Sequence, residues 1–338
     1  MKKRVLVTGG AGFIGSNFIL HWIKKNNESV LNFDNLTYAS NLKNLSSIED
    51  NKNYFFVKGD INDKTLLKEV LSKHKPRSIV NFAAETHVDN SITSPEAFIN
   101  SNITGTFNLL SATLEFYLSS SFEEKEKFKF LHVSTDEVFG SLKLDDDKST
   151  ELSAYRPNSP YSASKAASDH LVRAWAETFK LPVNITNCTN NYGPHQHTEK
   201  LIPLLISNCL NWKKLPIYGD GKNIRDWLFV EDHCEAICEV LDKGKVGETY
   251  NIGGNNQTSN IEITQKICSI LDKLSPSKKG NYSQLIEFVQ DRPGHDFRYN
   301  LDTSKIKKEL NWQPSETFDS GLKKTVSWYF EKYISGEK

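Results

Sequence analysis

Short apolar runs alternate with longer amphipathic stretches through the first half of the chain. We interpret the runs as β-strands at residues 4–8, 29–33, 54–57, 78–82, 131–134 with the residues just before them, and 183–186. Near-continuous apolar strands are typical of a parallel sheet that is covered on both faces. The stretches between them have helical patterns, with a long helix expected around residues 100–114, so the alternation predicts an α/β fold with a doubly wound parallel sheet.

The regular alternation breaks up after about residue 190. We therefore predict that residues 1–190 form the domain with the parallel sheet, to which some later segments return. Residues 191–338 would mainly form a smaller C-terminal α/β region that binds the substrate. Within the first part, the polar residues 119–129 are expected to be a surface connection, and residues 145–159 a loop covering the site.

A glycine-rich turn follows the first strand and leads into a helix. Backbone N–H groups at such a helix N-terminus bind the pyrophosphate of a dinucleotide. Asp34 ends the second strand about 20 residues past the turn, where a carboxylate accepts hydrogen bonds from the adenosine ribose and repels a 2′-phosphate. The pattern predicts a Rossmann-type domain that binds NAD rather than NADP. The residues expected to bind it are Gly9, Gly12, Phe13, Ile14, Gly15 and Asp34.

The next two strand ends supply further candidates for the cofactor site. Asp60 and Ile61 follow the third strand and are expected to contact the adenine. Ala83 and Ala84 follow the fourth strand, where small side chains allow close approach of a cofactor. The carboxyl ends of parallel strands form the crevice in which ligands bind, so these positions belong to one site.

The composition narrows the classes of partner. The 338 residues are 38% hydrophobic and 25% charged, and the formal net charge is +0. Such a chain has no basic field for nucleic acid or for an anionic membrane surface. No apolar run approaches transmembrane length, and the first residues lack the apolar segment of a signal peptide. We expect a cytoplasmic protein.

The cysteines and histidines suggest neither a disulfide framework nor a metal site. The five cysteines are scattered, and we interpret Cys234 and Cys238, four apart on an expected helix, as buried thiols. His195 and His197 are interpreted as a solvated pair. We predict no metal.

Two adjacent acids come directly after the strand that ends at residue 134. Thr135, Asp136 and Glu137 therefore lie at the edge of the sheet where ligands bind. Burial and mutual repulsion raise carboxylate pKa values. One such carboxyl group can stay protonated and act as an acid while its ionised neighbour acts as a base. A lone acidic pair is more often a solvent-facing loop, but the residues that follow favour catalysis.

Tyr161 and Lys165 lie four residues apart on a helix that begins at Pro160, hence on one face. A nearby ammonium stabilises a phenolate and lowers the tyrosine pKa from its ordinary value of about 10. We therefore expect Tyr161 to act as a base near neutral pH. The same spacing also suits a surface helix, and it is the position after Thr135 to Glu137 that favours a catalytic role.

The C-terminal region contains the cations that a diphosphate needs. Arginine and lysine bind phosphate oxygens through charge-assisted hydrogen bonds, and a tyrosine can pack on a flat base. The candidates are Lys200, Arg225, Arg292 and His295, with Tyr218 for the base.

Together these motifs resemble those of the extended short-chain dehydrogenase/reductase family, and within it the dTDP-glucose 4,6-dehydratases. The similarity runs nearly end to end. The glycine turn and the Tyr-Lys motif are typical of the broad family, and the Thr-Asp-Glu triplet is typical of the 4,6-dehydratases. The motifs nearest the C-terminus are those that bind the nucleotide part of the substrate in this family. The motifs are Thr8-Gly9-Gly10-Ala11-Gly12-Phe13-Ile14-Gly15, Ser134-Thr135-Asp136-Glu137-Val138, Tyr161-Ser162-Ala163-Ser164-Lys165, Asn190-Asn191-Tyr192-Gly193-Pro194, Glu199-Lys200-Leu201-Ile202-Pro203, Pro216-Ile217-Tyr218-Gly219, Ile224-Arg225-Asp226-Trp227 and Asp291-Arg292-Pro293-Gly294-His295-Asp296.

The resemblance implies that dTDP-glucose is converted to dTDP-4-keto-6-deoxyglucose and water, with no net redox change. Tyr161, helped by Lys165 and Thr135, would take the proton of the C4 hydroxyl while hydride passes from C4 to NAD. Glu137 would then remove the C5 proton as Asp136 protonates the leaving C6 hydroxyl, after which hydride returns to C6. Such a product feeds rhamnose and several amino-deoxy sugars, and the resemblance does not say which.

The resemblance also implies a homodimer and a set of substrate-binding residues. The dimer would pair two long helices of each subunit, here those around residues 100–114 and 161–180. The implied substrate-binding residues are His87, Thr135, Asn191, Glu199, Lys200, Leu201, Pro216, Tyr218, Arg225, Asn260, Arg292 and His295.

Three positions depart from the family's pattern. Phe139 stands where Tyr is common, Asn90 stands where Arg is expected, and residues 195–198 replace a more aromatic stretch that contains proline. The covering loop is also somewhat short. None of these changes removes a proposed proton carrier, so they bear on packing, dimer contacts and the shape of the hexose pocket.

Three alternatives share most of these motifs. A nucleotide-sugar 4-epimerase needs no C5 base or C6 acid, so Asp136 and Glu137 count against it. A dehydratase of a CDP- or UDP-linked sugar differs only in its base pocket. A catalytically silent NAD-binding sensor on the same fold would be expected to lose Tyr161, Lys165 or the acid pair, and all are present.

Overall fold

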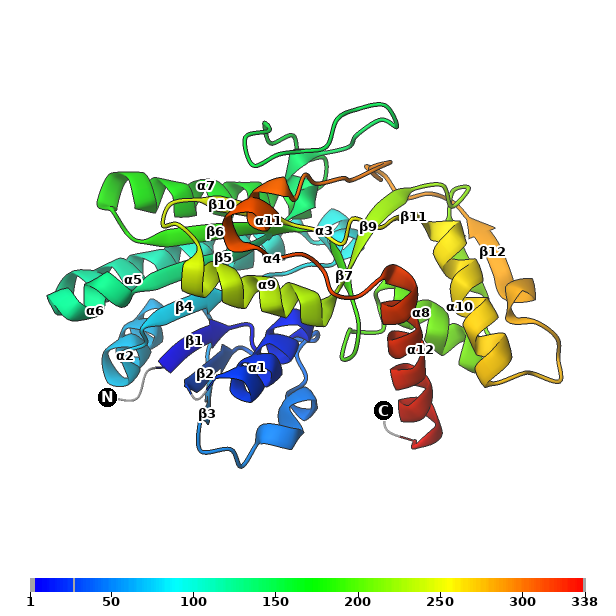
Figure 1. Ribbon diagram of the computed structural model, residues 1–338, viewed down its shortest axis with the longest axis horizontal. Coiled ribbons are helices and arrows are strands. Elements are labelled where there is room, and N and C mark those ends of the chain that lie inside the picture. Colours follow the sequence, from blue (N-terminus) through cyan, green and yellow to red (C-terminus); the bar gives the residue numbers. More distant parts are fainter. Residues whose placement is uncertain (1–3, 27, 337–338) are drawn as a thin grey trace.

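Seven parallel strands form the central sheet of the computed structural model, which describes residues 4–26 and 28–336. Their order across the sheet is β10-β6-β5-β4-β1-β2-β3 (Figure 1). The alternation of apolar runs and helical stretches predicted six of these strands, with ends displaced by a few residues, and missed β10, which joins the edge of the sheet from beyond residue 190. The strands are β1 (Arg4–Thr8), β2 (Ser29–Asp34), β3 (Tyr54–Lys58), β4 (Ser78–Asn81), β5 (Lys129–Thr135), β6 (Val183–Cys188) and β10 (Thr249–Ile252).

The direction in which the chain builds the sheet reverses between β1 and β4. From β1 the chain moves outward through β2 and β3, then crosses back to β4 on the other side of β1 and continues through β5 and β6. Leu6 of β1 accordingly pairs with Leu31 on one side and Ile79 on the other. In open α/β sheets this reversal leaves a crevice at the carboxyl ends of the strands, where ligands bind.

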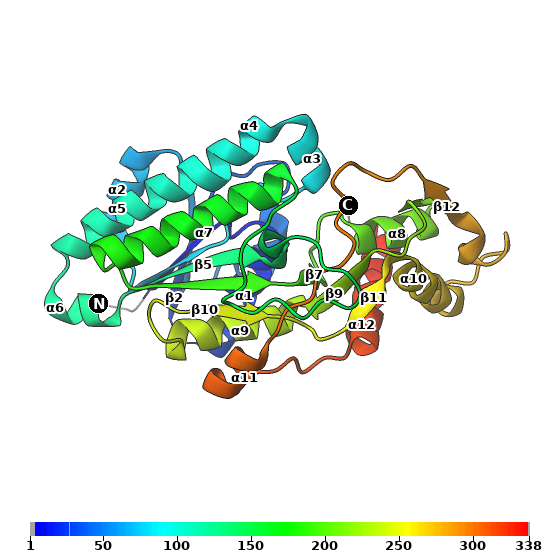
Figure 2. The same ribbon diagram turned by 90° about the horizontal axis from the view of Figure 1, so that it is seen from above.

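Helices cover both faces of the sheet, as Figure 2 shows from above. The apolar residues of the strands are buried against them in two separate cores, one on each face. On one face lie α2 (Lys64–His74), α5 (Thr106–Ser119) and α7 (Pro160–Phe179). On the other lie α1 (Phe13–Lys25), α9 (Val230–Lys243) and α11 (Ser304–Leu310).

The C-terminal region lies beside the sheet, at the right of Figure 1, and has a core of its own. β10 pairs with β6 and α9 packs on α1, so segments from beyond residue 190 do lie with the sheet, while the domain boundary itself stays a prediction. No helix in the described ranges combines the length and the apolar character needed to cross a membrane. The elements of this region are β7 (Asn190–Tyr192), α8 (Leu201–Leu210), β8 (Leu215–Tyr218), β9 (Ile224–Phe229), β11 (Gln257–Ser259), α10 (Asn260–Leu274), η4 (Tyr282–Leu285), β12 (Ile286–Val289) and α12 (Phe318–Ile334).

The helix expected at residues 100–114 is longer and less regular than predicted. α3 (Val88–Thr93) and α4 (Pro95–Phe98) precede a π-helical turn, η2 (Ile99–Gly105), which continues into α5. The wider turn places Asn102 so that its side chain bonds the backbone N (2.8 Å) and O (3.0 Å) of Glu85 and the Ser164 hydroxyl (2.8 Å). Such turns are frequent at functional sites, and this one ties the helix to the end of β4.

The polar stretch 119–129, predicted to be a plain surface connection, contains a short helix, α6 (Phe122–Lys127). Ser121 caps it and Glu124 bonds back to the Ser121 backbone, which is a capping box. Ser-x-x-Glu is a known helix-start signal that the sequence contained. The stretch is mostly exposed and joins α5 to β5, as predicted for a surface connection, and the short helix within it was not predicted.

Candidate active site

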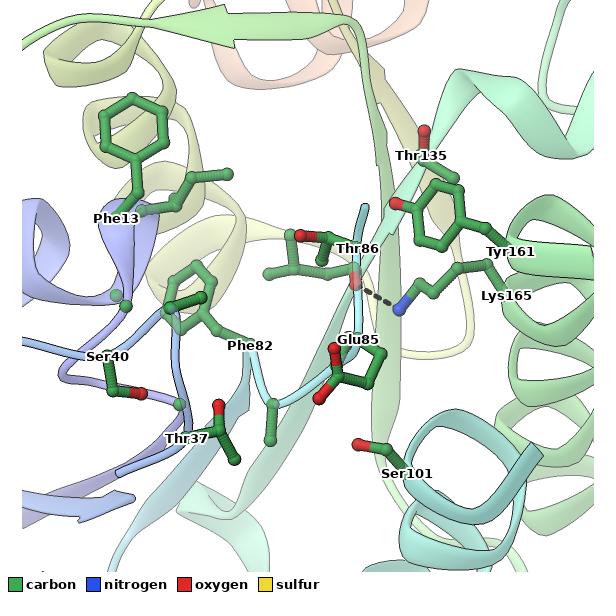
Figure 3. Close-up of a pocket in the computed structure, with 18 of the residues that line it drawn as sticks. Phe13, Thr37, Ser40, Phe82, Glu85, Thr86, Ser101, Thr135, Tyr161 and Lys165 are labelled. Carbon is green, nitrogen blue, oxygen red and sulfur yellow. Dashed lines mark hydrogen bonds between the residues drawn. The ribbon is translucent and has the colours of Figure 1, made fainter. Parts of the chain in front are cut away.

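A cavity of ≈ 470 Å³ opens at the carboxyl ends of β1, β4 and β5 (Figure 3). The residues predicted to bind the cofactor and those predicted to be catalytic all line it. They are Gly9, Gly12, Phe13, Ile14, Gly15, Asp34, Asp60, Ile61, Ala83 and Ala84, together with Thr135, Asp136, Glu137, Tyr161 and Lys165. The structure therefore brings together in one space what the sequence placed on separate strand ends.

The glycine turn presents a bare helix N-terminus to this cavity. Gly9 has φ +68°, a conformation that glycine adopts freely, and a Cβ on Gly15 would lie 2.8 Å from the Cα of Gly10 and closer still to the Gly9 carbonyl. Gly12 occupies the N-cap position of α1 and offers no side chain to the first N–H groups. These donors remain for an anion, so the turn fits the pyrophosphate of NAD.

Asp34 is nearly fully buried at the end of β2 and organises the neighbouring loop. Its carboxylate accepts hydrogen bonds from Ala11 N (2.9 Å), Leu36 N (2.7 Å) and the Ser40 hydroxyl (2.8 Å). A carboxylate has about four lone-pair sites, so one remains for a further donor such as a ribose hydroxyl. Its negative charge in a confined place also disfavours a 2′-phosphate. The donor set therefore fits NAD.

The two acids are held at the start of a short 3₁₀ helix, η3 (Asp136–Phe139). The Thr135 hydroxyl accepts from Glu137 N (3.3 Å) and donates to Asp136 Oδ1 (3.3 Å). Asp136 is 3% exposed, and within the described chain its Oδ2 is a buried oxygen without a hydrogen-bond partner. Burial first, and then the charge of Glu137, raise the pKa of Asp136 well above its usual range. Asp136 is therefore suited to carry a proton.

Glu137 differs from its neighbour in the charges around it. Burial raises its pKa, but three cations lower it, namely Arg225, Arg292 and Lys200. Glu137 also keeps partial exposure to the cavity, whereas Asp136 does not. The environment thus separates the pair into a protonated acid and a more readily ionised base, which is the arrangement that acid–base chemistry requires.

Tyr161 and Lys165 point from α7 into the cavity, with the Tyr161 hydroxyl near Thr135 (Figure 3). The Lys165 amino group donates to the Val133 carbonyl at 2.9 Å. The expectation that Tyr161 has a lowered pKa is wrong for the chain by itself. Burial, followed by the charge of Glu137, raises its pKa well above 10, and the neighbouring Thr135 hydroxyl opposes this only in part. Burial also lowers the pKa of Lys165.

The predicted substrate-binding residues divide into two groups. Thr135, Asn191, Glu199 and Lys200 line the cavity, and the Lys200 amino group donates to the Thr86 carbonyl at 2.8 Å. The others lie outside the cavity lining and belong to the C-terminal region or to the loop before α3. They are His87, Leu201, Pro216, Tyr218, Arg225, Asn260, Arg292 and His295.

Part of this second group is gathered around Asp89 of α3. Arg292 forms an ion pair with Asp89 at 2.9 Å, and the Tyr218 hydroxyl donates to the other Asp89 oxygen at 3.3 Å. The Arg292 guanidinium lies 6.0 Å from the Tyr218 ring centroid, and His295 pairs with Asp291 at 2.6 Å. An aromatic ring, the Arg292 cation and an imidazole, whose pKa burial lowers, thus assemble outside the cavity lining.

Arg225 makes most of its hydrogen bonds to the backbone of a neighbouring segment. Its guanidinium is 6% exposed and donates to the backbone carbonyls of Ile224 (2.9 Å), Asp296 (2.8 Å) and Phe297 (3.2 Å). It also lies 4.4 Å from the ring centroid of Tyr299. Arg225 therefore holds the 291–298 segment in place and directs its charge at Glu137, and its role as a diphosphate ligand stays a prediction.

The residues that depart from the family's pattern have partners here. Phe139 packs edge-on against Tyr155 with ring centroids 5.1 Å apart, and Asn90 donates to the Tyr38 hydroxyl at 3.3 Å. The interpretation of His195 as solvated is wrong, because its ring packs on Trp328 with centroids 4.8 Å apart and burial lowers its pKa to about 4. His197 is exposed, as expected.

The thiols and the possible metal ligands can be located as well. Cys234 and Cys238 are buried free thiols, which confirms their interpretation. Among residues 4–26 and 28–336, no group of three or more His, Cys, Asp or Glu side chains is arranged to hold a metal ion.

Several residues of the site had no signal in the motifs. Thr37, Ser40, Glu85, Thr86 and Ser101 line the cavity from loops and from η2 (Figure 3). Beneath the cavity, the structure also buries His132 of β5 and Asp169 of α7. Only Asp169 had a detectable signal, since it continues the four-residue spacing of Tyr161 and Lys165.

Comparisons with known proteins identify the family. The family model described as GDP-mannose 4,6 dehydratase matches residues 6–325. The dTDP-glucose 4,6-dehydratase of Neisseria gonorrhoeae is 54% identical over 333 residues, covering 98% of this chain and 96% of that protein. The dTDP-glucose 4,6-dehydratase 1 of Escherichia coli K12 is 50% identical over 345 residues, covering 99% and 95%.

Solved structures show the same relationship. The dTDP-glucose 4,6-dehydratase of Bacillus anthracis in complex with NAD has TM-score 0.86 and 45% identity, covering 99% of this chain and 100% of that one. The enzyme of Streptomyces venezuelae, also with NAD bound, has TM-score 0.89 and 43% identity, covering 98% of both chains. A UDP-glucose 4-epimerase of Thermotoga maritima has a similar fold, with TM-score 0.85, but is only 26% identical. The chain therefore belongs to the dTDP-glucose 4,6-dehydratase family.

Proposed function

We propose that this protein converts dTDP-glucose to dTDP-4-keto-6-deoxyglucose and water, using bound NAD that is regenerated in each cycle. The protein is an enzyme, a hydro-lyase of the family to which the chain belongs. The observation that carries the proposal is the meeting of the glycine turn, the Tyr161–Lys165 pair and the two acids around one cavity. An epimerase has no use for the acid pair.

In the first step, Tyr161 takes the proton of the C4 hydroxyl. The Thr135 hydroxyl lies near that of Tyr161, and Lys165 lies one helical turn away on α7. The raised pKa of Tyr161 means that its phenolate needs positive charge nearby, and within the chain Lys165 supplies it. Bound NAD supplies the hydride acceptor and, in its oxidised form, the positive charge of the nicotinamide ring.

In the elimination step, the environments of the two acids determine their roles. Glu137, which three cations help to ionise, removes the C5 proton. Asp136, which burial keeps protonated, gives its proton to the leaving C6 hydroxyl. The low local dielectric strengthens both interactions, because little water enters the site at Asp136.

The nucleotide part of the substrate would be bound by the cluster of side chains around Asp89. Arg292 and Tyr218 are already positioned there, and the charge of Lys200 acts on both Asp89 and Glu137. A diphosphate would compete with Asp89 for Arg292, and the Tyr218 ring would pack on the base. This arrangement supports a substrate linked to a nucleoside diphosphate, and the family to which the chain belongs supports dTDP as that nucleotide.

The same proposal includes a homodimer and a cytoplasmic location. Phe107 of α5 is 42% exposed and Phe179 of α7 is 46% exposed, and both rings contact Trp175. Exposed aromatic groups on neighbouring helices are typical of a protein interface. A cytoplasmic location is supported by the five cysteines, which are all free thiols.

The proposal is tested with purified protein and dTDP-glucose, without added reductant. The alkali-induced absorbance of the 4-keto-6-deoxy product is followed, with CDP-glucose, UDP-glucose and UDP-N-acetylglucosamine run beside it. Turnover of dTDP-glucose alone is the expected result. Turnover of another nucleotide sugar would keep the chemistry and overturn the substrate, and no product from any of them would overturn the dehydratase activity.

A further inference from the structure

Asp169 lies on the same face of α7 as Tyr161 and Lys165, beneath the cavity. Tyr161, Lys165 and Asp169 are each four residues apart, so they share one face of the helix. All three are buried, with exposed fractions of 8%, 4% and 2%. Figure 3 shows Tyr161 and Lys165 pointing from this helix into the cavity, and Asp169 lies one turn further from it.

One oxygen of Asp169 is surrounded by donors. Its Oδ2 accepts hydrogen bonds from the hydroxyls of Ser134 (2.7 Å) and Tyr155 (3.1 Å) and from the Asn187 amide (3.4 Å). Three donors converging on a single oxygen fit an ionised carboxylate, which only accepts. The other oxygen, Oδ1, has no hydrogen-bond partner in the described chain and lies 3.4 Å from Nε2 of His132.

His132 stands between Asp169 and Lys165 and is fully buried on β5. The Thr8 hydroxyl donates to the Asn81 carbonyl oxygen (2.6 Å), so the Asn81 amide nitrogen donates to Nδ1 of His132 (3.0 Å). Nδ1 is then an acceptor, and the single ring proton is on Nε2. That nitrogen is 3.2 Å from the Ser168 hydroxyl, which itself donates to the Lys165 carbonyl (2.8 Å). It also lies 3.3 Å from the Lys165 amino group and 3.4 Å from Asp169 Oδ1.

Among the groups around Lys165, Asp169 is the anion that stabilises the charged form of its amino group. Burial lowers the pKa of Lys165, and Asp169, followed by Cys188 of β6, opposes this. Cys188 is a neutral thiol because burial raises its pKa, and His132 is a neutral ring because burial, with the charge of Lys165, lowers its pKa to about 4. Tyr161 is neutral in the chain by itself, since burial raises its pKa. A buried cation without such compensation loses its proton.

We propose that Asp169 is a positioning residue of this active site, which acts across His132 to keep the Lys165 amino group charged and in place beside Tyr161. The inference rests on the proposed function for the catalytic role of Lys165. The effect of Asp169 on the protonation of Lys165 does not depend on that function. It adds to the Tyr161–Lys165 pair a buried carboxylate and an imidazole that touch neither substrate nor cofactor.

The experiment compares Asp169→Asn, which has nearly the same shape, with Glu177→Gln. Glu177 is exposed on the same helix, so its substitution removes one negative charge without touching the network. Melting temperatures of the purified holoproteins are measured at about pH 7 to 10, below the pKa of about 10.4 of a free lysine. Loss of Asp169 lowers the folded-state pKa of Lys165 further, so the deficit of Asp169→Asn should be largest at neutral pH and shrink as the pH rises.

The pH profile of dTDP-glucose turnover is the second readout. In Asp169→Asn the basic limb of kcat/KM should move to lower pH by at least one unit, which is a loss of about tenfold at a pH above both limbs. Glu177→Gln should leave both measurements unchanged. A deficit in melting temperature that does not vary with pH, together with an unmoved basic limb, would overturn the proposal and leave Asp169 a merely structural residue.

A second variant covers the case in which Asp169→Asn fails to fold. Asp169→Ser removes the same negative charge and still offers an oxygen that can accept from the donors around Asp169 Oδ2, so the same shifts are expected in the same direction. A folded Asp169→Ser protein whose deficit in melting temperature does not vary with pH, and whose basic limb is unmoved, would overturn the proposal. If the wild type does not dehydrate dTDP-glucose, the proposed function fails, while the melting curves still decide the role of Asp169.

Discussion

Replacing Glu137 with Gln should separate the oxidation step of the reaction from the elimination step. The amide has nearly the same size, and the hydrogen bond that fixes this turn joins the Thr135 hydroxyl to the backbone of residue 137 rather than to its side chain. Tyr161, Lys165 and Thr135, which serve the C4 oxidation, are unchanged. The variant therefore loses only the base for the C5 proton.

The size of the effect follows from the role of a positioned base. A general base contributes about 10²–10⁴-fold to a rate, so kcat should fall by about a thousandfold. The cations Arg225, Arg292 and Lys200 that favour the ionised form of Glu137 remain in place, so substrate binding should change little. NADH should accumulate on the enzyme after substrate is added, because oxidation continues and hydride return is blocked.

Three measurements follow these steps in one sample. The product is measured by its alkali-induced absorbance, bound NADH by its own absorbance, and removal of the C5 proton by deuterium uptake from heavy water. Glu85→Gln is the control, since Glu85 is another carboxylate that lines the cavity and has no assigned proton role. Wild-type deuterium uptake in Glu137→Gln would refute the assignment of Glu137 as the base, as would a slow elimination in Glu85→Gln alone.

Four further predictions test other parts of the site. Asp136→Asn should lose turnover by about 10²–10⁴-fold, yet it should melt above the wild type at neutral pH, because the folded-state pKa of this carboxyl group is raised and its ionisation disfavours folding. Each unit of that raised pKa is worth about 1.4 kcal/mol, and the gain in melting temperature should vanish as the pH falls to about 4. Tyr161→Phe should keep its NAD, measured in the purified protein, and show no NADH signal with substrate, whereas a persisting NADH signal would exclude Tyr161 as the first base. Gly15→Ala should lose about 1–3 kcal/mol of stability and most of its bound NAD, because a Cβ there meets the backbone of Gly9, and an unchanged denaturation curve would contradict this. Asp34→Asn should weaken NAD binding and narrow the preference over NADP, measured by titration of both cofactors, and an unaltered preference would show that another group excludes the 2′-phosphate.

Features that depend on residues close together in the chain could be predicted from the sequence. Apolar runs and their spacing predicted six of the seven strands of the sheet, and the four-residue interval predicted that Tyr161 and Lys165 share a face. Gly9 to Gly15 predicted the turn into α1, because the conformations they adopt depend on neighbours a few residues away. Such features follow from the periods of helix and strand, which any window of the chain contains.

The tertiary structure alone decided the electrostatics. The raised pKa of Tyr161, opposite to the expectation, comes from burial among segments far apart in the chain. The use of Arg225 on backbone carbonyls and the packing of His195 on Trp328 likewise depend on contacts across more than 70 and more than 130 residues. Desolvation and the pairing of buried polar groups are properties of the packed interior, so no spacing within a single segment of sequence determines them.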